Sequence, residues 1–361
     1  MHTLTLSAAV DLGPLGELPP GSYLVEDTQA ASMLVQSPRG TVRLSAPPQF
    51  WGDMALFEGQ VPDSVLFARS GGFGDLLFLT PLLAEVRRRW PKCRIGVACA
   101  IPRRCVLDGL GLVDVWESVP PAIKVCQGYE RVIAFESVIE SAPREHYVDA
   151  LARSCGLELP PGPESRRCRY VITPAEQAWV SEMYPRNPAR KRLGVQWQAS
   201  TPARSYPLRD LHTVCGYLGG HGWDVWLLGA PNDVRARCLP DSGVRNVAAD
   251  ERPSFRQSCA ILSTCDVVLA PDSALLHVAG ALGLPAVGLF GPIEPKSRIA
   301  YSPSTRALKG AIPCAGCGHH PRFPGDWPLG MPCSRSGQCD ALVAIAPRII
   351  ISAVEAAYPV T

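Results

Sequence analysis

The stretch Cys265–Pro292, CDVVLAPDSALLHVAGALGLPAVGLFGP, decides the fold. Its pattern predicts a short apolar strand over Val267–Ala270, a helix over Ser273–Leu282 and a second strand over Ala286–Phe290. In a parallel α/β sheet, anionic ligands bind just beyond the carboxyl end of a strand, where the next helix begins. The sequence therefore predicts a ligand site around Asp272. The alternative is one more βαβ unit in which these residues only cap the helix.

The same stretch carries a family resemblance. The residues Asp-Ser-Ala-x-x-His-x-Ala-x-Ala-x-Gly-x-Pro, followed by Phe-Gly-Pro, resemble the nucleotide-sugar loop of the family 9 glycosyltransferases, the lipopolysaccharide heptosyltransferase family. That loop usually reads Asp-(Ser/Thr)-Gly-x-x-His, and Ala274 stands where the family prefers glycine. Three further stretches fit in the same order, so the resemblance covers roughly residues 64–358.

The resemblance implies an α/β fold of the GT-B type, with two Rossmann-like domains facing a cleft. The acceptor would bind the first domain and the nucleotide-sugar donor the second. In the donor loop, Asp272 would accept hydrogen bonds from the donor sugar, while Ser273 and the amides near Ala274 would meet phosphate. His277 lies one turn further along, where it either touches the donor or serves as a packing residue.

The composition is that of a globular protein with balanced charge. The 361 residues are 47% hydrophobic and 19% charged, which suits two domains plus an extra piece. The 35 basic and 33 acidic residues leave a net charge of +2, which gives no indication of nucleic-acid binding. Arginines nevertheless cluster, and the sequence leaves open whether they form a phosphate-facing stripe or solvated surface. The clusters are Arg87–Arg89, Arg103 and Arg104, Arg166, Arg167 and Arg169, and Arg190 and Arg192.

Targeting signals are not evident. No run of 18 apolar residues occurs, so no transmembrane helix is expected, and the N-terminus lacks the basic start and apolar core of a signal peptide. Fourteen cysteines without a secretion signal suggest reduced thiols. A cytoplasmic protein is therefore expected.

The chain is predicted to divide into five segments. Residues 1–60 contain short alternating runs (GSYLVEDT, ASMLVQS, GTVRLSA) that predict a β-rich module, followed by a linker that docks through Phe50, Trp51 and Phe57. The sequence leaves the role of this module open between acceptor contact, oligomerisation and packing. The other segments are a Rossmann-like acceptor domain over 61–170, a linker over 171–192, a Rossmann-like nucleotide-sugar domain over 193–340 with a Cys-rich loop at 306–340, and a C-terminal helix over 341–361. The linker is predicted to begin with a helix that Thr173 caps, with Pro174 in its first turn.

The first domain opens with Ser64–Trp90, SVLFARSGGFGDLLFLTPLLAEVRRRW, which predicts a buried strand, a glycine loop and a helix kinked at Pro81. Its Gly-Asp-x-x-x-x-Thr-Pro-x-Leu segment resembles the family's N-terminal motif, in which the aspartate is the general base. The resemblance assigns that role to Asp75, in a tight loop shaped by Gly71, Gly72 and Gly74. A carboxylate there can take the proton of an acceptor hydroxyl. The alternative is that the aspartate only caps the helix.

The second domain opens with LGVQW and the loop QASTPARSYPLRDL, which resemble the family's phosphate-gripping strand and loop. Ser200 and Thr201 match the hydroxyl positions, and Arg204 stands near the usual lysine. A guanidinium suits a diphosphate because it can bind two oxygens at once; the alternative is a surface arginine in a mobile loop. Further on, Gly229 to Asn232 resemble the family's Gly-Gly-Pro loop, which borders the nucleotide base or ribose.

Four cysteines are grouped near the C-terminus. Cys314-x2-Cys317 and Cys333-x5-Cys339 have a spacing that resembles a structural zinc site, with the adjacent His319 and His320 as substitute ligands. The alternative is a set of cysteines without a metal.

The predicted activity is sugar transfer from a nucleotide sugar to an acceptor hydroxyl. The chain contains no Asp-x-Asp pair, which argues against metal-dependent GT-A chemistry, and the resemblance implies inversion at the anomeric carbon without a catalytic divalent metal. The family reading is transfer of heptose from an ADP-activated donor to lipopolysaccharide core. A second reading is a phage-type enzyme that modifies a hydroxymethylated DNA base with a UDP-sugar. A third is a non-catalytic sugar-nucleotide-binding scaffold. The oligomeric state is not predicted.

Overall fold

The structure is a computed structural model of the chain. It describes residues 2–11, 17–25, 42–45, 62–136, 138–229, 244–318 and 338–359. The chain forms two compact units. The first contains Met1–Ala142 and Tyr147–Arg166, and the second contains Pro143–His146 and Arg167–Thr361.

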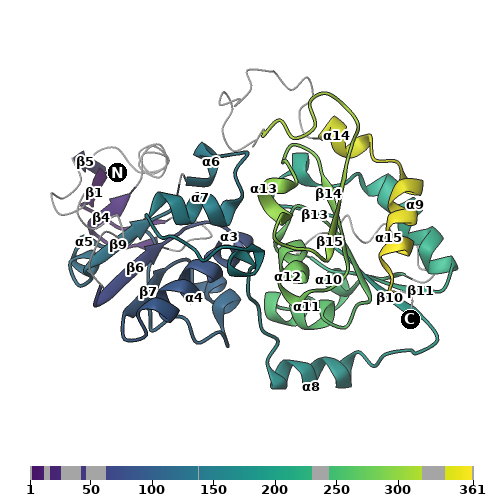
Figure 1. The fold of residues 1–361 in the computed structure, drawn as a ribbon, viewed down its shortest axis with the longest axis horizontal. Coiled ribbons are helices and arrows are strands. Elements are labelled where there is room, and N and C mark those ends of the chain that lie inside the picture. The colour runs from purple at the N-terminus through teal and green to yellow at the C-terminus, as the bar shows by residue number, and fades with distance from the viewer. Residues whose placement is uncertain are drawn as a thin grey trace. The chain divides into compact units, whose positions relative to one another are not determined.

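The first unit is built on a parallel sheet of four strands, in the order β8-β7-β6-β9. Figure 1 labels β6, β7 and β9 of this sheet. The strands are β6 (Ser64–Ala68), β7 (Arg94–Ala98), β8 (Val115–Glu117) and β9 (Arg131–Ala134). The central strands are almost continuously apolar, as expected for a parallel sheet that helices cover on both faces. The strand order reverses between β6 and β9, which makes their carboxyl ends the point where such sheets bind ligands.

The segment after β6 forms two helices instead of the single kinked helix that the sequence predicts. Helix α3 (Phe73–Leu77) begins after Gly72, so Asp75 is its third residue. Helix α4 (Thr80–Arg89) then starts afresh, with Pro81 in its first turn. A proline is tolerated there because the amide it lacks has no partner within the helix. The proline therefore lies at the break between the two helices. Because Phe78 and Leu79 between them keep helical dihedral angles, the predicted kink stays a prediction.

Short helices complete the first unit. They are η2 (Ile101–Leu107, a 3₁₀ helix), α5 (Ile123–Cys126), α6 (Val138–Ser141), α7 (Tyr147–Ser154) and the 3₁₀ helix η3 (Pro163–Arg166).

The N-terminal residues form a small antiparallel sheet in the order β4-β1-β5, with a separate hairpin of β2 and β3. The strands are β1 (His2–Leu6), β2 (Val10–Asp11), β3 (Glu17–Leu18), β4 (Gly21–Val25) and β5 (Val42–Ser45). Two of the three predicted β runs are confirmed as strands. The third run and the predicted docking residues Phe50, Trp51 and Phe57 lie outside the described residues. The Leu24 amide donates to the Pro121 carbonyl at 3.0 Å, which joins this sheet to the rest of the first unit.

The second unit contains a parallel sheet of six strands in the order β12-β11-β10-β13-β14-β15. The strand predictions at residues 267 and 286 are confirmed. The order reverses between β10 and β13, as in a Rossmann fold, so a ligand is expected beyond the carboxyl ends of these two strands. The strands are β10 (Lys191–Val195), β11 (Trp223–Leu227), β12 (Val244–Arg245), β13 (Val267–Pro271), β14 (Ala286–Phe290) and β15 (Thr305–Lys309).

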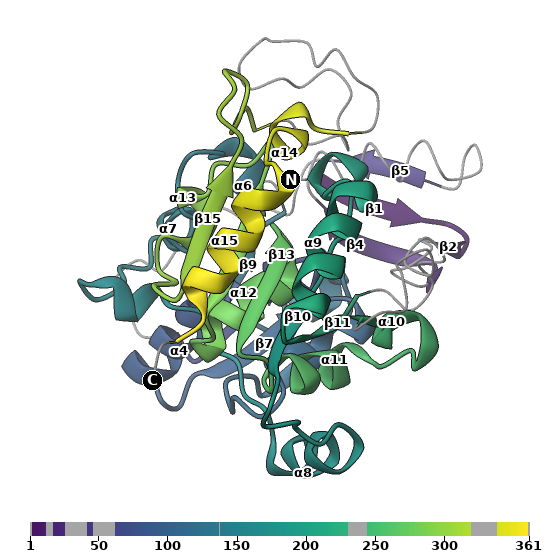
Figure 2. The same cartoon turned by 90° about the vertical axis from the view of Figure 1, so that its right-hand side faces the viewer.

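Helices cover this sheet on both faces, and α9 and α15 lie together on one of them (Figure 2). The predicted C-terminal helix is two helices, α14 and α15, because Pro347 begins the second. The helices are α8 (Pro174–Met183), the 3₁₀ helix η4 (Pro202–Arg204), α9 (Leu208–Gly220), α10 (Val247–Asp250), α11 (Phe255–Leu262), α12 (Ala274–Leu282), α13 (Lys296–Ile299), α14 (Asp340–Val343) and α15 (Pro347–Ala357).

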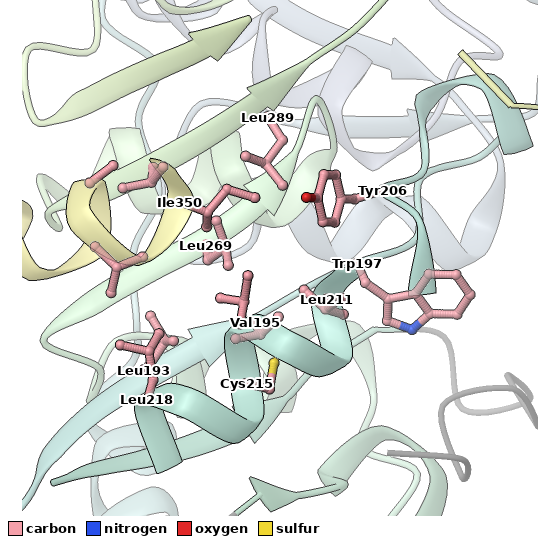
Figure 3. Close-up of a cluster of buried hydrophobic side chains, with 14 of the residues drawn as sticks. Leu193, Val195, Trp197, Tyr206, Leu211, Cys215, Leu218, Leu269, Leu289 and Ile350 are labelled. Carbon is pink, nitrogen blue, oxygen red and sulfur yellow. The ribbon is translucent and has the colours of Figure 1, made fainter. Parts of the chain in front are cut away.

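The core of the second unit lies between the sheet and helices α9 and α15. Figure 3 shows Val195 and Leu269 of the sheet packed with Leu211 of α9 and Ile350 of α15, all fully buried. Each such side chain contributes about 1.5–3 kcal/mol by leaving water. Tyr206 extends this core toward the loop after β10, and its hydroxyl donates to the Ile345 carbonyl at 2.6 Å. The loop that carries the candidate site is thus anchored in the core.

Candidate functional sites

The first candidate site lies at the strand reversal of the second unit, where the loop after β10 meets the turn after β13. The Ser273 hydroxyl donates to Gln196 Oε1 at 2.6 Å and so ties the two strand ends together. Within the loop, Ser205 Oγ accepts from the Ala199 amide at 3.0 Å and donates to the Thr201 carbonyl at 2.9 Å. The loop is therefore fixed by its own hydrogen bonds.

Arg204 and Asp272 form the centre of this site. Arg204 Nη2 lies 2.9 Å from Asp272 Oδ2 and also donates to the Asp272 carbonyl oxygen. Its Nη1 donates to Ser200 Oγ at 3.3 Å. The structure thus brings together three predicted donor-site residues from two loops that lie far apart in the sequence.

Asp272 is almost completely buried, with 2% of its surface exposed. Its Oδ1 lies 3.1 Å from His277 Nε2, and its Oδ2 lies 3.5 Å from Arg298 Nε. Burial alone would raise the pKa of Asp272, but the charges of Arg204 and Arg298 and the bond to His277 outweigh burial and hold the pKa below its usual value. The carboxylate therefore organises two guanidinium groups and an imidazole around one point.

Sequence reasoning missed Arg298. It lies on the four-residue helix α13, and its side chain is only 6% exposed. The His146 ring nitrogen Nε2 contacts the Arg298 carbonyl oxygen at 3.2 Å, and the Arg298 Nη1 donates to Ser297 Oγ at 2.9 Å. The only signal in the sequence is a basic residue shortly after the Phe-Gly-Pro turn, which does not by itself predict burial.

Two donors at this site have no acceptor. Thr201 is 8% exposed, and its Oγ1 atom is buried. Arg204 Nε is also buried, and neither atom has a hydrogen-bond partner among the described residues. A buried polar group left unpaired costs about 1–3 kcal/mol. Arg204 Nε can only donate, and the Thr201 hydroxyl can donate as well as accept. A ligand that offers acceptors, as phosphate oxygens do, therefore satisfies both groups.

The remaining predicted donor-site residues border the same place. Ser273 precedes α12 without bonding its amides through the side chain, because its hydroxyl is bonded to Gln196, and Ala274 is the first residue of that helix. Gly229 follows β11 with φ 149°, a conformation that disfavours other residues, and a Cβ there would lie 3.9 Å from Gln196 Cγ. Asn232 lies outside the described residues.

The second candidate site lies at the strand reversal of the first unit and contains Asp75. Its Oδ1 lies 2.8 Å from Arg69 Nη2, and its Oδ2 accepts from the Gly72 amide at 2.5 Å. The Asp75 side chain keeps 26% of its surface exposed, whereas that of Arg69 keeps 5%. Asp75 thus caps its helix, as the simpler alternative predicts, and remains open to a second molecule. Sequence reasoning missed Arg69, whose signal is a charged residue at the end of a buried strand.

The glycine loop is shaped around this carboxylate. A Cβ at Gly71 would lie 2.5 Å from Asp75 Cγ, a distance that no side chain can occupy. A Cβ at Gly72 would lie 3.4 Å from Asp75 Oδ2, which is an ordinary contact. Gly74 lies within α3. The loop therefore requires glycine at position 71 because Asp75 lies directly against it.

The cysteines show a partial grouping. Cys314 and Cys317 lie in one turn, in which the Gly316 amide donates to the Gly291 carbonyl at 2.9 Å. Cys339 also lies close to Gly291, because a Cβ added to Gly291 would be 2.9 Å from Cys339 Sγ. Cys333 lies outside the described residues, as do His319 and His320. Among the residues that are described, no group of three or more His, Cys, Asp or Glu side chains is arranged to hold a metal ion.

No helix in the described part of the chain is both long enough and apolar enough to cross a membrane.

Comparison with known proteins gives a family match. Residues 145–324 match the model of glycosyltransferase family 9 (heptosyltransferase). The chain is 33% identical over 99 residues to lipopolysaccharide heptosyltransferase 1 of Pseudomonas aeruginosa, which covers 27% of each chain. It is 23% identical over 194 residues to lipopolysaccharide heptosyltransferase 2 of Escherichia coli, covering 51% of this chain and 52% of the relative. The chain thus matches about a quarter to about half of the length of these relatives.

Solved structures match over much more of the chain. A family 9 glycosyltransferase from Veillonella parvula has a TM-score of 0.62 at 15% identity, covering 84% of this chain and 99% of the other. The iron-containing dodecameric glycosyltransferase TibC from enterotoxigenic E. coli has a TM-score of 0.55 at 14% identity, covering 99% of this chain and 92% of TibC.

Two Rossmann-like units and these structural matches define the fold as that of a GT-B glycosyltransferase. The predicted α/β fold class is confirmed. With the match to the family model, the chain belongs to glycosyltransferase family 9.

Proposed function

We propose that the protein is an inverting glycosyltransferase that uses a nucleotide sugar and needs no catalytic divalent metal. The observation that carries the proposal is the pair of buried, unpaired donors, Thr201 Oγ1 and Arg204 Nε, at the strand reversal of the second unit. A donor diphosphate supplies the acceptors that they lack.

Arg204 stabilises the leaving group in this proposal. As the bond between the anomeric carbon and the phosphate oxygen breaks, its electron pair goes to the nucleotide diphosphate, whose charge rises. A guanidinium already held in place by Asp272 and Ser200 needs little reorganisation to meet that charge. In this proposal Asp272 orients Arg204. The hydrogen bond that Asp272 is expected to accept from the donor sugar stays a prediction.

Asp75 is the proposed base. The acceptor hydroxyl oxygen forms the new bond to the anomeric carbon on the side opposite the leaving group, and its proton passes to Asp75. A single displacement of this kind inverts the configuration at that carbon. Arg69 and the Gly72 amide hold the carboxylate, and its exposed fraction leaves it accessible to an acceptor.

For the substrates, we propose an ADP-activated heptose as donor and lipopolysaccharide core as acceptor. The names of the curated relatives support heptose as the sugar and lipopolysaccharide as the acceptor. The ADP-activated form of the donor is supported by a second structure of TibC, which is described as a complex with ADP-D-β-D-heptose. A cytoplasmic location fits a nucleotide-sugar donor and rests on the sequence argument alone.

The test is transfer measured by mass spectrometry on two acceptor sets. We expect truncated lipopolysaccharide to gain the mass of one heptose from ADP-heptose. A mass gain on hydroxymethylated DNA from a UDP-sugar would replace this proposal with the DNA-modification alternative. Donor binding without transfer to either acceptor set, and with Asp75→Asn unchanged, would favour the scaffold.

A structural metal at the cysteines is a separate proposal. Cys314, Cys317, Cys333 and Cys339 would supply four thiolates, which suit zinc, and TibC is described as iron-containing. Such a metal would have a structural role and takes no part in the sugar transfer. Elemental analysis of the purified protein tests it: about one tightly held zinc or iron per chain is expected, and less than about half an equivalent would overturn it.

A further inference from the structure

Glu136 holds the loop that carries the proposed base. The loop begins at Ser70, and the Glu136 carboxylate accepts from two of its groups: Oε1 from the Ser70 amide and Oε2 from the Ser70 hydroxyl. The Ser70 carbonyl in turn accepts from Arg103 Nη1. All three polar groups of Ser70 are therefore bonded to side chains from elsewhere in the first unit.

The topology explains why Glu136 can reach this loop. Strands β6 and β9 are parallel neighbours, with Ala68 opposite Ala134, so the residues that follow them emerge side by side. Glu136 comes two residues after that pair, at the strand reversal of the first unit. Arg69 Nη1 strengthens the junction, because it donates to the carbonyl oxygens of Phe135 and Glu136, the latter at 2.6 Å.

The end of β9 therefore fixes the loop through two charged groups. Arg69 connects that strand end to the Asp75 carboxylate, and Glu136 connects it to Ser70. Hydrogen bonds to ionised groups are roughly twice as strong as those between neutral ones. Position 71, directly after Ser70, is where the loop lies against Asp75. A shift of Ser70 would thus be passed on to the carboxylate.

We infer that Glu136 is a positioning residue for sugar transfer, which fixes Ser70 and through it the location of Asp75. The inference rests on the proposed role of Asp75 as base. Both carboxylate oxygens of Glu136 accept hydrogen bonds from Ser70, so Glu136 acts on Asp75 through the loop. A misplacement of a reacting group by about 1 Å can cost about 100-fold in rate, so a residue that only positions the base can matter strongly.

The experiment compares two substitutions with a matched control. Glu136→Ala removes both acceptors. Glu136→Gln keeps one acceptor for the Ser70 amide, and its NH₂ group can donate a hydrogen bond to the Ser70 hydroxyl oxygen. Glu117→Ala is the control, because Glu117 also ends a strand of this sheet but accepts from Tyr129 at 3.1 Å.

We expect Glu136→Ala to lower kcat by about 10- to 100-fold with the donor KM within about twofold, because only the base is displaced. Glu136→Gln should keep kcat within about threefold of the wild type, and Glu117→Ala should do the same. If Glu136→Gln loses as much as Glu136→Ala, the carboxylate itself takes part in the chemistry and the positioning role is wrong.

A second readout does not depend on activity. Amide hydrogen exchange of residues 69–75 should be about 10-fold faster in Glu136→Ala and unchanged in Glu117→Ala, since the lost bonds hold that loop. Unchanged exchange in Glu136→Ala would overturn the inference even if the enzyme is active. If the wild type transfers no sugar to any acceptor, the proposed function fails, while the exchange result still decides whether Glu136 fixes the loop.

Discussion

Replacing Gly71 with alanine should displace Asp75 without altering its chemistry. The added Cβ would lie 2.5 Å from Asp75 Cγ and 2.7 Å from Asp75 Oδ2. Carbon atoms in contact are about 3.5–4.0 Å apart, so the carboxylate or the loop must move by about 1 Å. A misplacement of that size can cost about 100-fold in rate, which corresponds to about 2.7 kcal/mol of transition-state stabilisation.

The neighbouring glycine provides the matched control. A Cβ at Gly72 would lie 3.4 Å from Asp75 Oδ2, and the backbone there (φ −73°, ψ −177°) is extended and open to alanine. Gly72→Ala also keeps the amide that donates to Asp75. We expect its kcat to stay within about threefold of the wild type, since an ordinary contact displaces nothing.

The assay measures kcat at saturating donor and acceptor, the dissociation constant of the donor, and the free energy of unfolding in urea. Overpacking should destabilise Gly71→Ala by about 1–3 kcal/mol, while donor affinity should not change because the donor site lies in the second unit. Equal loss of kcat in both variants would refute the steric argument. So would full turnover by folded Gly71→Ala.

Three further predictions concern single side chains. Asp75→Asn should lower transfer by about 10²- to 10⁴-fold with donor binding retained, measured by initial rates and calorimetry; equal turnover would remove the base. Thr201→Val should leave the free energy of unfolding unchanged or raise it by up to about 1 kcal/mol, yet weaken donor binding by about 5- to 10-fold, because its hydroxyl is unpaired only without ligand; unchanged affinity would exclude a phosphate contact. The Asp272 carboxylate has a lowered pKa in the folded protein, so it stabilises the fold fully above its unfolded pKa of about 4. This contribution is lost progressively as pH falls below about 4 towards the lowered folded pKa. Urea titrations should therefore show a shallower pH dependence in Asp272→Asn, which should also lose about 3–5 kcal/mol at pH 7; parallel curves would contradict the ion-pair account.

The sequence predicts well where a local pattern decides the structure. Helix α8 begins after Thr173 with Pro174 in its first turn, and Thr173 caps it through its hydroxyl, as the capping residue and proline indicate. Strand β14 has the predicted bounds, and β13 is one residue longer than predicted. Each of these elements is set by residues within one or two turns of it.

The prediction is less complete where a proline interrupts a helical pattern. Pro81 marks the break between α3 and α4, but the sequence does not show that Phe78 and Leu79 keep helical dihedral angles across it. Pro347 presents the same ambiguity at the C-terminus, where it starts α15.

The site residues that the sequence did not predict are those that act through contacts between distant positions in the chain. Glu136 contacts Ser70 across 66 positions, and no periodicity or motif connects the two. Arg298 joins Asp272 only because β13 and β14 are neighbours in the sheet. Asp272 and Arg204 were found because a family motif marks each, although their contact is equally distant in sequence.

The most direct test of the donor site is calorimetric titration of ADP into the wild type, Arg204→Gln and Arg209→Gln. Arg204 is the guanidinium with an unpaired donor at the strand reversal, and Arg209 is an exposed arginine on α9 that serves as the control. We predict one ADP per chain in the wild type and in Arg209→Gln. Affinity should fall by about 10- to 150-fold in Arg204→Gln, as expected for a charge-assisted bond of about 1.5–3 kcal/mol. Equal affinity in all three proteins, or no binding of ADP, UDP, GDP or CMP to the wild type, would contradict the proposed donor site.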